Sequence, residues 1–131
     1  MSKQTIIVGI VGIAVLVSAY IVMASPSSPK AVHSSFVTSY QQTAGAVLLD
    51  VRTPSEFAEG HIEGAINLDF ENPNFSAEAQ KLDTTKSYFV YCRSGNRSGQ
   101  AIPILKRVGI TNIQELKGGI LANQRSLTLV Q

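Results

Sequence analysis

Residues 87–109 read SYFVYCRSGNRSGQAIPILKRVG and join an apolar run, a polar loop and an amphipathic run. A strand is predicted over residues 87–91, which after the first residue are aromatic or β-branched. Apolar side chains then recur on one face at Ala101, Ile102, Leu105 and Val108. This spacing predicts a helix over residues 98–108, in which Pro103 would cause a kink or a delayed start. Cys92 stands at the junction of strand and loop.

Strands and helices alternate through the rest of the chain as well. Further strands are predicted over residues 46–51, 65–68 and 112–116. Further helices are predicted over residues 35–42, 54–59 and 76–81, the second with Thr53 as its N-cap. The run AVLLDV at 46–51 is apolar enough to be buried on both faces, as strands of parallel sheets are. The pattern indicates an α/β fold with a parallel sheet flanked by helices, in which ligands bind at the carboxyl ends of strands.

The loop after Cys92 has the composition of an anion-binding loop. A thiolate there would face a helix N-terminus, loop amides and the guanidinium groups of Arg93 and Arg97, all of which lower a thiol pKa. Gly95 permits the backbone turn that points successive amides inward. The alternative is an inert buried cysteine, which is common at strand ends but favours apolar neighbours that this loop lacks.

Three stretches together resemble a single-domain rhodanese: LLDVRTPSEFAEGHIEGAINL over 48–68, CRSGNRSGQA over 92–101 and GGI over 118–120. The resemblance covers about residues 30–131 and implies a rhodanese-like domain without a cofactor. It implies that Cys92 is the catalytic nucleophile, which takes a sulfane sulfur from a small anionic donor such as thiosulfate and holds it as a persulfide. The acceptor would be cyanide or a thiol, including a thiol of a partner protein.

Site roles follow from the resemblance and from charge. The substrate-binding residues are expected to be those of the loop, Arg93, Ser94, Gly95, Asn96, Arg97 and Ser98. The loop amides would hold the persulfide sulfur, and the two arginines would attract the donor, Arg97 more strongly. Asp50 and Arg52 are expected to support the loop by pairing their charges. The alternative for these two is a solvated ion pair of little energetic value.

Two further features of the resemblance concern structure more than chemistry. The run EFAEGHIEGAIN at 56–67, which begins with Glu56, is expected to be structural. Within it, His61 is expected to order a turn, with acid–base catalysis as the alternative. The family commonly has Trp where this chain has Asn123, and the chain contains no Trp. This departure predicts a looser cover of the domain by its C-terminal residues.

Two other functions compete with sulfur transfer. A non-catalytic binding module would keep the fold, but inactive versions typically lack the cysteine. A cysteine phosphatase or arsenate reductase also places Cys and Arg around an anion-binding loop before a helix. Its loop has five residues between the two, whereas Cys92 and Arg97 enclose four. A shorter loop suits one sulfur atom better than a tetrahedral oxyanion.

Composition limits the remaining classes of function. The 131 residues fit one domain, and a formal net charge of +2 without runs of basic residues gives no nucleic-acid surface. A single cysteine excludes an intramolecular disulfide and a multi-cysteine zinc site. The two histidines do not cluster with it in sequence, so no metal site is predicted.

The N-terminal residues read differently from the rest. Residues 5–24 are uncharged and long enough to cross a bilayer as a helix, and 25–29 (SPSSP) are typical of a linker. We expect residues 1–24 to be a signal anchor, with residues 30–131 as an extracytoplasmic domain because Lys3 precedes the apolar run. The alternative is a signal peptide cleaved near Ala24, which would release a periplasmic or secreted protein.

Overall fold

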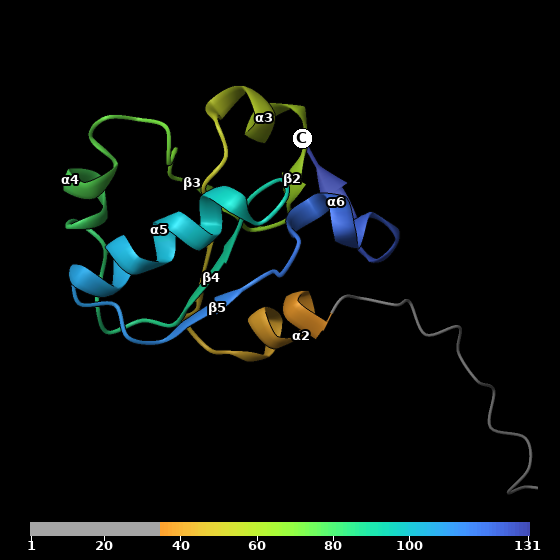
Figure 1. The fold of residues 1–131 in the computed structure, drawn as a ribbon. Coiled ribbons are helices and arrows are strands. Elements are labelled where there is room, and N and C mark those ends of the chain that lie inside the picture. The colour runs from red at the N-terminus through yellow and green to blue at the C-terminus, as the bar shows by residue number, and fades with distance from the viewer. Residues whose placement is uncertain (1–34) are drawn as a thin grey trace, which may run out of the picture. The chain divides into compact units, whose positions relative to one another are not determined.

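The described part of the chain, residues 35–131 of a computed structural model, is built around a four-stranded parallel sheet. The strand order is β3-β1-β4-β5, with every pair parallel (Figure 1). The strands are β1 (Val47–Asp50), β3 (Ile66–Asn67), β4 (Tyr88–Tyr91) and β5 (Ile113–Glu115). All four lie within the predicted strands, which confirms the expected parallel α/β architecture.

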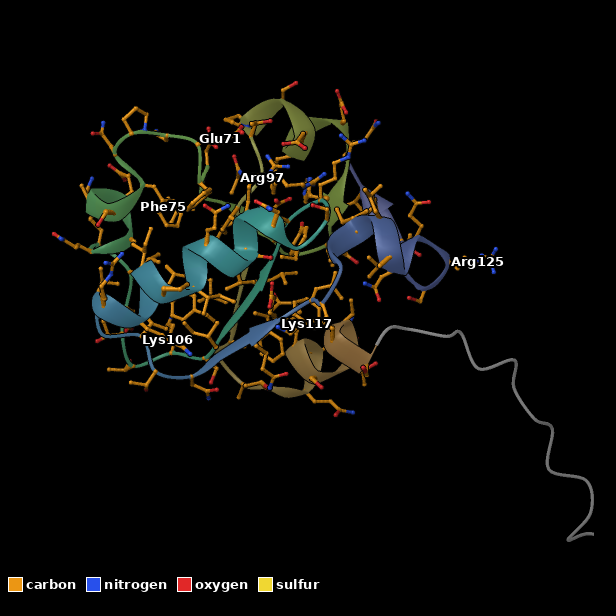
Figure 2. The ribbon with its side chains drawn as sticks, in the orientation of Figure 1. Glu71, Phe75, Arg97, Lys106, Lys117 and Arg125 are labelled. Carbon is orange, nitrogen blue, oxygen red and sulfur yellow. The ribbon has the colours of Figure 1, made fainter. Side chains whose placement is uncertain are left out.

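Helices cover both faces of the sheet. The longer ones are α2 (Ser35–Gln42) and α5 (Asn96–Arg107), and the shorter ones are α3 (Pro54–Glu59), α4 (Phe75–Ala79) and α6 (Gly119–Asn123). On one face, Phe75 of α4 and Leu105 of α5 pack on alternate strand residues; Figure 2 shows the Phe75 side chain there. On the other face, Phe36 of α2 and Ile120 of α6 pack on the strand residues that point to that face. The sheet is therefore buried on both sides.

Strand β4 shows how this burial arises from sequence. Its four residues are all buried: Tyr88 and Val90 belong to one core cluster, and Phe89 and Tyr91 to the other. Because successive strand residues point to opposite faces, a run of apolar residues is needed where both faces are covered. In β1, Leu49 and the partly buried Val47 pack in the first cluster and Leu48 packs in the second, which confirms the prediction that residues 46–51 are buried on both faces.

Several boundaries differ from the sequence predictions. Helices α2 and α3 have the predicted bounds, whereas α4 ends at Ala79 and not at residue 81. Helix α5 begins at Asn96 and includes Pro103, so the predicted delayed start is wrong. The cause is Gly95, whose φ of 94° turns the chain from the loop directly into the helix.

The C-terminal residues add elements that the sequence did not predict. After α6 come a 3-10 turn, η1 (Gln124–Ser126), and strand β6 (Leu129–Val130), which pairs antiparallel with β2 (His61–Ile62). Residues 1–24, for which an anchor or signal peptide is predicted, lie outside the described residues, and so does the predicted linker 25–29. Within residues 35–131, no helix has the length and apolar character needed to span a bilayer.

Candidate active site

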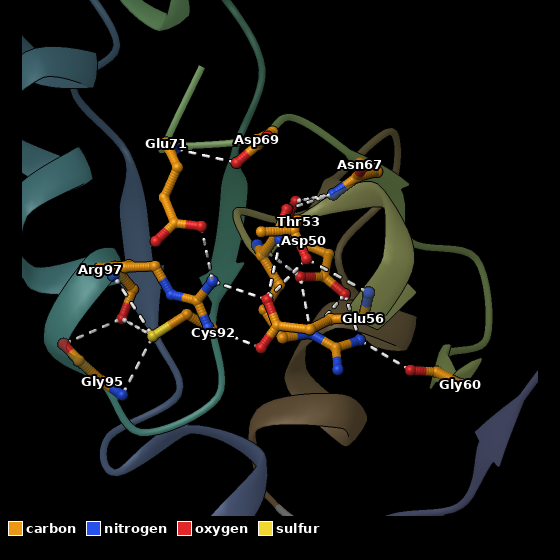
Figure 3. Close-up of polar contacts among 12 residues, drawn as sticks. Asp50, Thr53, Glu56, Gly60, Asn67, Asp69, Glu71, Cys92, Gly95 and Arg97 are labelled. Carbon is orange, nitrogen blue, oxygen red and sulfur yellow. Dashed lines mark hydrogen bonds and ion pairs between the residues drawn. The ribbon is translucent and has the colours of Figure 1, made fainter. Parts of the chain in front are cut away.

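Cys92 directly follows β4 and lies where the loop amides converge. Its sulfur accepts hydrogen bonds from the amides of Gly95, at 3.0 Å, and Ser98, at 3.4 Å (Figure 3). The Ser98 hydroxyl oxygen lies 3.4 Å from the same sulfur. The thiol is fully buried, yet these contacts are polar. The arrangement therefore differs from that of an inert cysteine in an apolar core.

The surroundings of Cys92 favour the thiolate. Burial raises the pKa of the thiol. Hydrogen bonds from the Ser98 side chain and from the amides of Ser98, Gly95 and Ser94 lower the pKa by more than burial raises it. The resulting pKa lies below the ordinary value for cysteine. The thiolate is the nucleophilic form of cysteine, so the loop produces the form that covalent sulfur chemistry requires.

Gly119, the first residue of α6, lets the backbone of α6 pack against the loop. The amide of Ile120 donates to the Cys92 carbonyl at 3.1 Å, and the amide of Leu121 donates to the Arg93 carbonyl at 2.9 Å. A Cβ on Gly119 would lie 2.5 Å from both carbonyl oxygens, closer than real Cβ atoms approach. Only glycine lets the start of α6 approach the loop this closely.

Arg97 is already paired within the protein. Its Nη1 and Nη2 atoms lie 2.7 and 2.8 Å from the two carboxylate oxygens of Glu56, and Nη1 lies 3.8 Å from Glu71 (Figure 3). The sequence predicted Arg97 as the stronger donor-binding cation. The structure brings it to the loop but offsets its charge with two carboxylates.

Glu56 is held for this pairing by its own helix. At the start of α3 it forms a capping box with Thr53, in which the Glu56 amide donates to Thr53 Oγ1 and the Thr53 amide donates to Glu56 Oε2. The hydrogen bond from Arg97 is the largest influence on the carboxyl group, and it lowers the pKa of Glu56 to about 2. The carboxylate is therefore ionised at neutral pH.

The remaining loop residues are exposed or turned aside. The Asn96 side chain accepts a hydrogen bond from Gln100 at 2.7 Å, one turn along α5. Ser94 is exposed, and its amide is among those that favour the Cys92 thiolate. Arg93 is also exposed and has no ion-pair partner among residues 35–131. Of the two predicted donor-binding arginines, Arg93 is the one whose charge is not offset.

Asp50 and Arg52 form a buried ion pair at the end of β1. Arg52 Nη2 lies 2.6 Å from Asp50 Oδ2, and the two side chains are 8% and 0% exposed. The same Nη2 donates to the Gly60 carbonyl at 2.7 Å, and Asn67 Nδ2 donates to the carbonyls of both pair members. The reading of these residues as a solvated pair is therefore wrong. They tie the α3 turn and β3 to β1.

His61 and Asn123 have structural contacts. The His61 ring stacks on Phe57 with centroids 3.8 Å apart, and its Nδ1 lies 3.0 Å from the Phe57 carbonyl, as expected of a turn-ordering residue. Asn123 Nδ2 donates to the carbonyls of Lys117 and Gly119, at 3.0 and 2.8 Å. These bonds and the β2–β6 pairing hold the C-terminal residues, so the predicted loose cover is not seen.

Glu115 is a site residue that the sequence did not indicate. It lies on β5, and its Oε1 accepts a hydrogen bond from the Ser98 hydroxyl at 2.8 Å. Glu56 was placed only among structural residues, although it pairs with Arg97. Within residues 35–131, no cluster of three or more His, Cys, Asp or Glu side chains could hold a metal ion.

Comparison with known proteins agrees with the fold. Residues 37–125 match the family model described as the Rhodanese-like domain. The chain is 38% identical over 89 residues to thiosulfate sulfurtransferase 16, chloroplastic, of Arabidopsis thaliana, a match that covers 60% of this chain and 74% of that protein. It is 40% identical over 74 residues to the uncharacterized protein YqhL of Bacillus subtilis, covering 56% of this chain and 57% of that protein.

A solved structure gives the same result. The crystal structure of a rhodanese-related protein from Thermoplasma volcanium superposes with a TM-score of 0.62 at 29% identity, covering 72% of this chain and 90% of that one. With a family model matched over most of its length, this chain belongs to the family of rhodanese-like domains.

Proposed function

We propose that this protein is a sulfurtransferase that moves a sulfane sulfur from a small anionic donor to a thiophilic acceptor through a persulfide on Cys92. The observation that carries the proposal is the convergence of the Gly95 and Ser98 amides on one sulfur atom. Relatives named as thiosulfate sulfurtransferases support the choice of reaction. The acceptor is cyanide or a thiol, which a partner protein could supply.

In the loading step, the Cys92 thiolate attacks the outer sulfur of thiosulfate. A bond forms between Cys92 Sγ and that sulfur, the sulfur–sulfur bond of thiosulfate breaks, and its electron pair leaves with sulfite. The negative charge then lies on the outer sulfur of the persulfide. Loop amides at a helix N-terminus stabilise such a charge, and exposed Arg93 attracts the incoming dianion.

In the unloading step, the acceptor attacks the outer sulfur. With cyanide, a carbon–sulfur bond forms, the bond to Sγ breaks, and its electron pair returns to Cys92 as the thiolate. The product is thiocyanate. The enzyme alternates between the thiolate and the persulfide form, and the first product leaves before the acceptor reacts. Ping-pong kinetics are therefore expected.

The test uses the single cysteine. Incubation with thiosulfate should add the mass of one sulfur atom to the reduced protein, and cyanide should remove it with formation of thiocyanate. Cys92→Ser should abolish both events. Turnover that survives in Cys92→Ser would contradict the assignment of Cys92 as the sulfur carrier. A wild-type protein that gains no sulfur would contradict sulfur transfer itself and favour a binding module.

We further propose, from sequence alone, that residues 5–24 hold the protein at a membrane with the domain on the extracytoplasmic side. Fractionation of cells that express the full chain tests this. Recovery with membranes after high-salt washing supports the anchor. A soluble product that begins at Ser25 would show cleavage after Ala24 and contradict it.

A further inference from the structure

The hydroxyl of Ser98 has one proton and three possible acceptors. Its oxygen lies 2.8 Å from Glu115 Oε1, 3.2 Å from the Gly95 carbonyl oxygen and 3.4 Å from Cys92 Sγ. Ser98 is fully buried, and the Glu115 side chain is 11% exposed. Because the carboxylate is both charged and nearest, it takes the proton while Cys92 is a neutral thiol.

Ionisation of Cys92 changes this arrangement. In the thiol form, the S–H group can donate to the Ser98 oxygen, which in turn donates to Glu115. Once the thiol proton is lost, the thiolate also needs a hydrogen bond from Ser98. The hydroxyl cannot donate to two anions at once, so the carboxylate and the thiolate compete for one proton.

We propose that Glu115 is a positioning residue that competes with the Cys92 thiolate for the proton of Ser98 and thereby favours the sulfur-loaded form of the cysteine. Glu115 acts only through Ser98 and is not required to touch the substrate. Its part in setting the acidity of Cys92 is separate from the sulfur chemistry, whereas its effect on loading rests on the proposed function.

The effect on loading follows from where the charge lies. In the thiolate the charge is on Sγ, beside the Ser98 hydroxyl group, whose proton is donated to Glu115. In the persulfide the charge is on the outer sulfur, and Sγ is bonded to two atoms and uncharged. The competition is thereby relieved, so Glu115 destabilises the thiolate more than the persulfide.

The other charged groups near Cys92, Ser98 and Glu115 do not compete for the Ser98 proton. Lys117 Nζ lies 2.6 Å from Glu115 Oε2, the oxygen that does not contact Ser98. Lys106 of α5 lines the same groove as Glu115 and lies at the far end of α5 from Arg97 (Figure 2). Arg97 faces Cys92 from the start of α5, with its charge offset by Glu56 and Glu71. None of these groups contacts the Ser98 hydroxyl.

The first measurement is the rate of alkylation of Cys92 by iodoacetamide as a function of pH. Glu115→Gln makes the acceptor neutral, so its rate profile should move to lower pH and its rate below the midpoint should rise about threefold. Glu115→Asp keeps the charge but is one methylene too short to hold Ser98, and its profile should move in the same direction. Glu78→Gln, the same change on α4, should leave the profile unmoved.

The second measurement separates the route through Ser98 from a direct effect of charge. In a Ser98→Ala background, Glu115→Gln should no longer move the profile. A shift of equal size in that background, or no shift in the presence of Ser98, would overturn the proposal. An unshifted profile in Glu115→Asp would also overturn it, because charge alone would then explain the effect.

The third measurement is the ratio of persulfide to free cysteine at a fixed ratio of thiosulfate to sulfite. Glu115→Gln should lower this ratio about threefold, since it stabilises the thiolate more than the persulfide. An unchanged or higher ratio would overturn the effect on loading. If wild-type protein gains no sulfur at all, the proposed function fails, while the alkylation profiles still decide the competition for the proton.

Discussion

Glu56 and Arg97 lie 41 positions apart in the sequence and meet beside the Cys92 loop in a two-pronged ion pair, with contacts of 2.7 and 2.8 Å. Their side chains are 25% and 18% exposed, so the pair is only partly solvated. A loop with two arginines attracts anions less strongly when one guanidinium is held by a carboxylate. The anion selectivity of the site should therefore depend on Glu56 as much as on the loop.

Glu56→Gln should increase the preference of Cys92 for anionic reagents. The substitution keeps a side chain that can accept from Arg97 but removes the charge that offsets it. The ratio of the alkylation rates with iodoacetate and iodoacetamide should rise about threefold at low ionic strength and less in high salt. Glu63→Gln, the same change at an exposed position, is the control. An unchanged ratio would mean that the Glu56 charge does not act at the loop.

Arg93→Gln should have the opposite effect. Arg93 is exposed and has no ion-pair partner among the described residues, so its charge is available to an incoming anion. The iodoacetate to iodoacetamide ratio should fall about threefold, and the KM for thiosulfate should rise with it. Arg125→Gln, on the η1 turn, provides the matched control. Equal ratios for the two variants would remove Arg93 from donor binding.

The Glu56–Arg97 pair should also make stability depend on pH in acid. The folded-state pKa of Glu56 is about 2, lowered first by the hydrogen bond from Arg97 from an ordinary value of 4.5. A carboxyl group with a lowered pKa stabilises the fold above its ordinary pKa, and this contribution is lost as pH falls toward 2. For a partly exposed pair we expect about 1 kcal/mol.

Urea unfolding of wild type and Glu56→Gln at neutral pH and at several values below 4.5 measures this contribution. The difference in unfolding free energy between the two proteins should be constant at neutral pH and should shrink as pH is lowered. A difference that stays constant across the acid range would show that the lost stability comes from packing or from the capping box, and not from the ionised carboxylate.

Much of the fold was predictable because its signals are local. The strand, loop and helix around Cys92 follow each other without interruption, and the apolar runs 46–51 and 87–91 show burial on both faces. Short elements carry no such signal. Strands β2 and β6 have two residues each, too few to show an alternating pattern, and they form by pairing with each other across the chain.

The site was predictable to the extent that it is continuous in sequence. Cys92 and the loop amides follow from one stretch of residues. The partners of that stretch come from elsewhere: Glu56 from α3 and Glu115 from β5. A carboxylate paired with a loop arginine looks the same in sequence as one on a solvated helix face. Only the packing of α3 and β5 around the loop distinguishes them.

Loop length is the feature that separates sulfur transfer from phosphatase chemistry in sequence, and it can be tested directly. Inserting one glycine between Gly95 and Asn96 should move the Ser98 amide away from Cys92 while the Gly95 amide keeps its place. Misplacement by about 1 Å can cost about a hundredfold where catalysis depends on positioning, so sulfur transfer should fall by that order. Circular dichroism checks that the variant folds. Sulfur transfer at the wild-type rate would refute the spacing argument. A new activity on aryl phosphates, as high as the sulfur transfer that was lost, would show that loop length selects the anion.

Gly119→Ala should disrupt the loop although it substitutes none of the loop residues. The added Cβ would lie 2.5 Å from the carbonyl oxygens of Cys92 and Arg93, so the loop or α6 must move. Gly45→Ala is a matched control, because Gly45 also has a positive φ, 70° against 61°, but has no atom within 4 Å of an added Cβ. Both variants should lose about 1 kcal/mol of stability from backbone strain, while only Gly119→Ala should lose more stability from the clash.

Only in Gly119→Ala should the alkylation profile of Cys92 move to higher pH, because the amides that favour the thiolate would no longer converge on the sulfur. If both variants kept the wild-type profile, the close approach of α6 would have no part in positioning the cysteine loop.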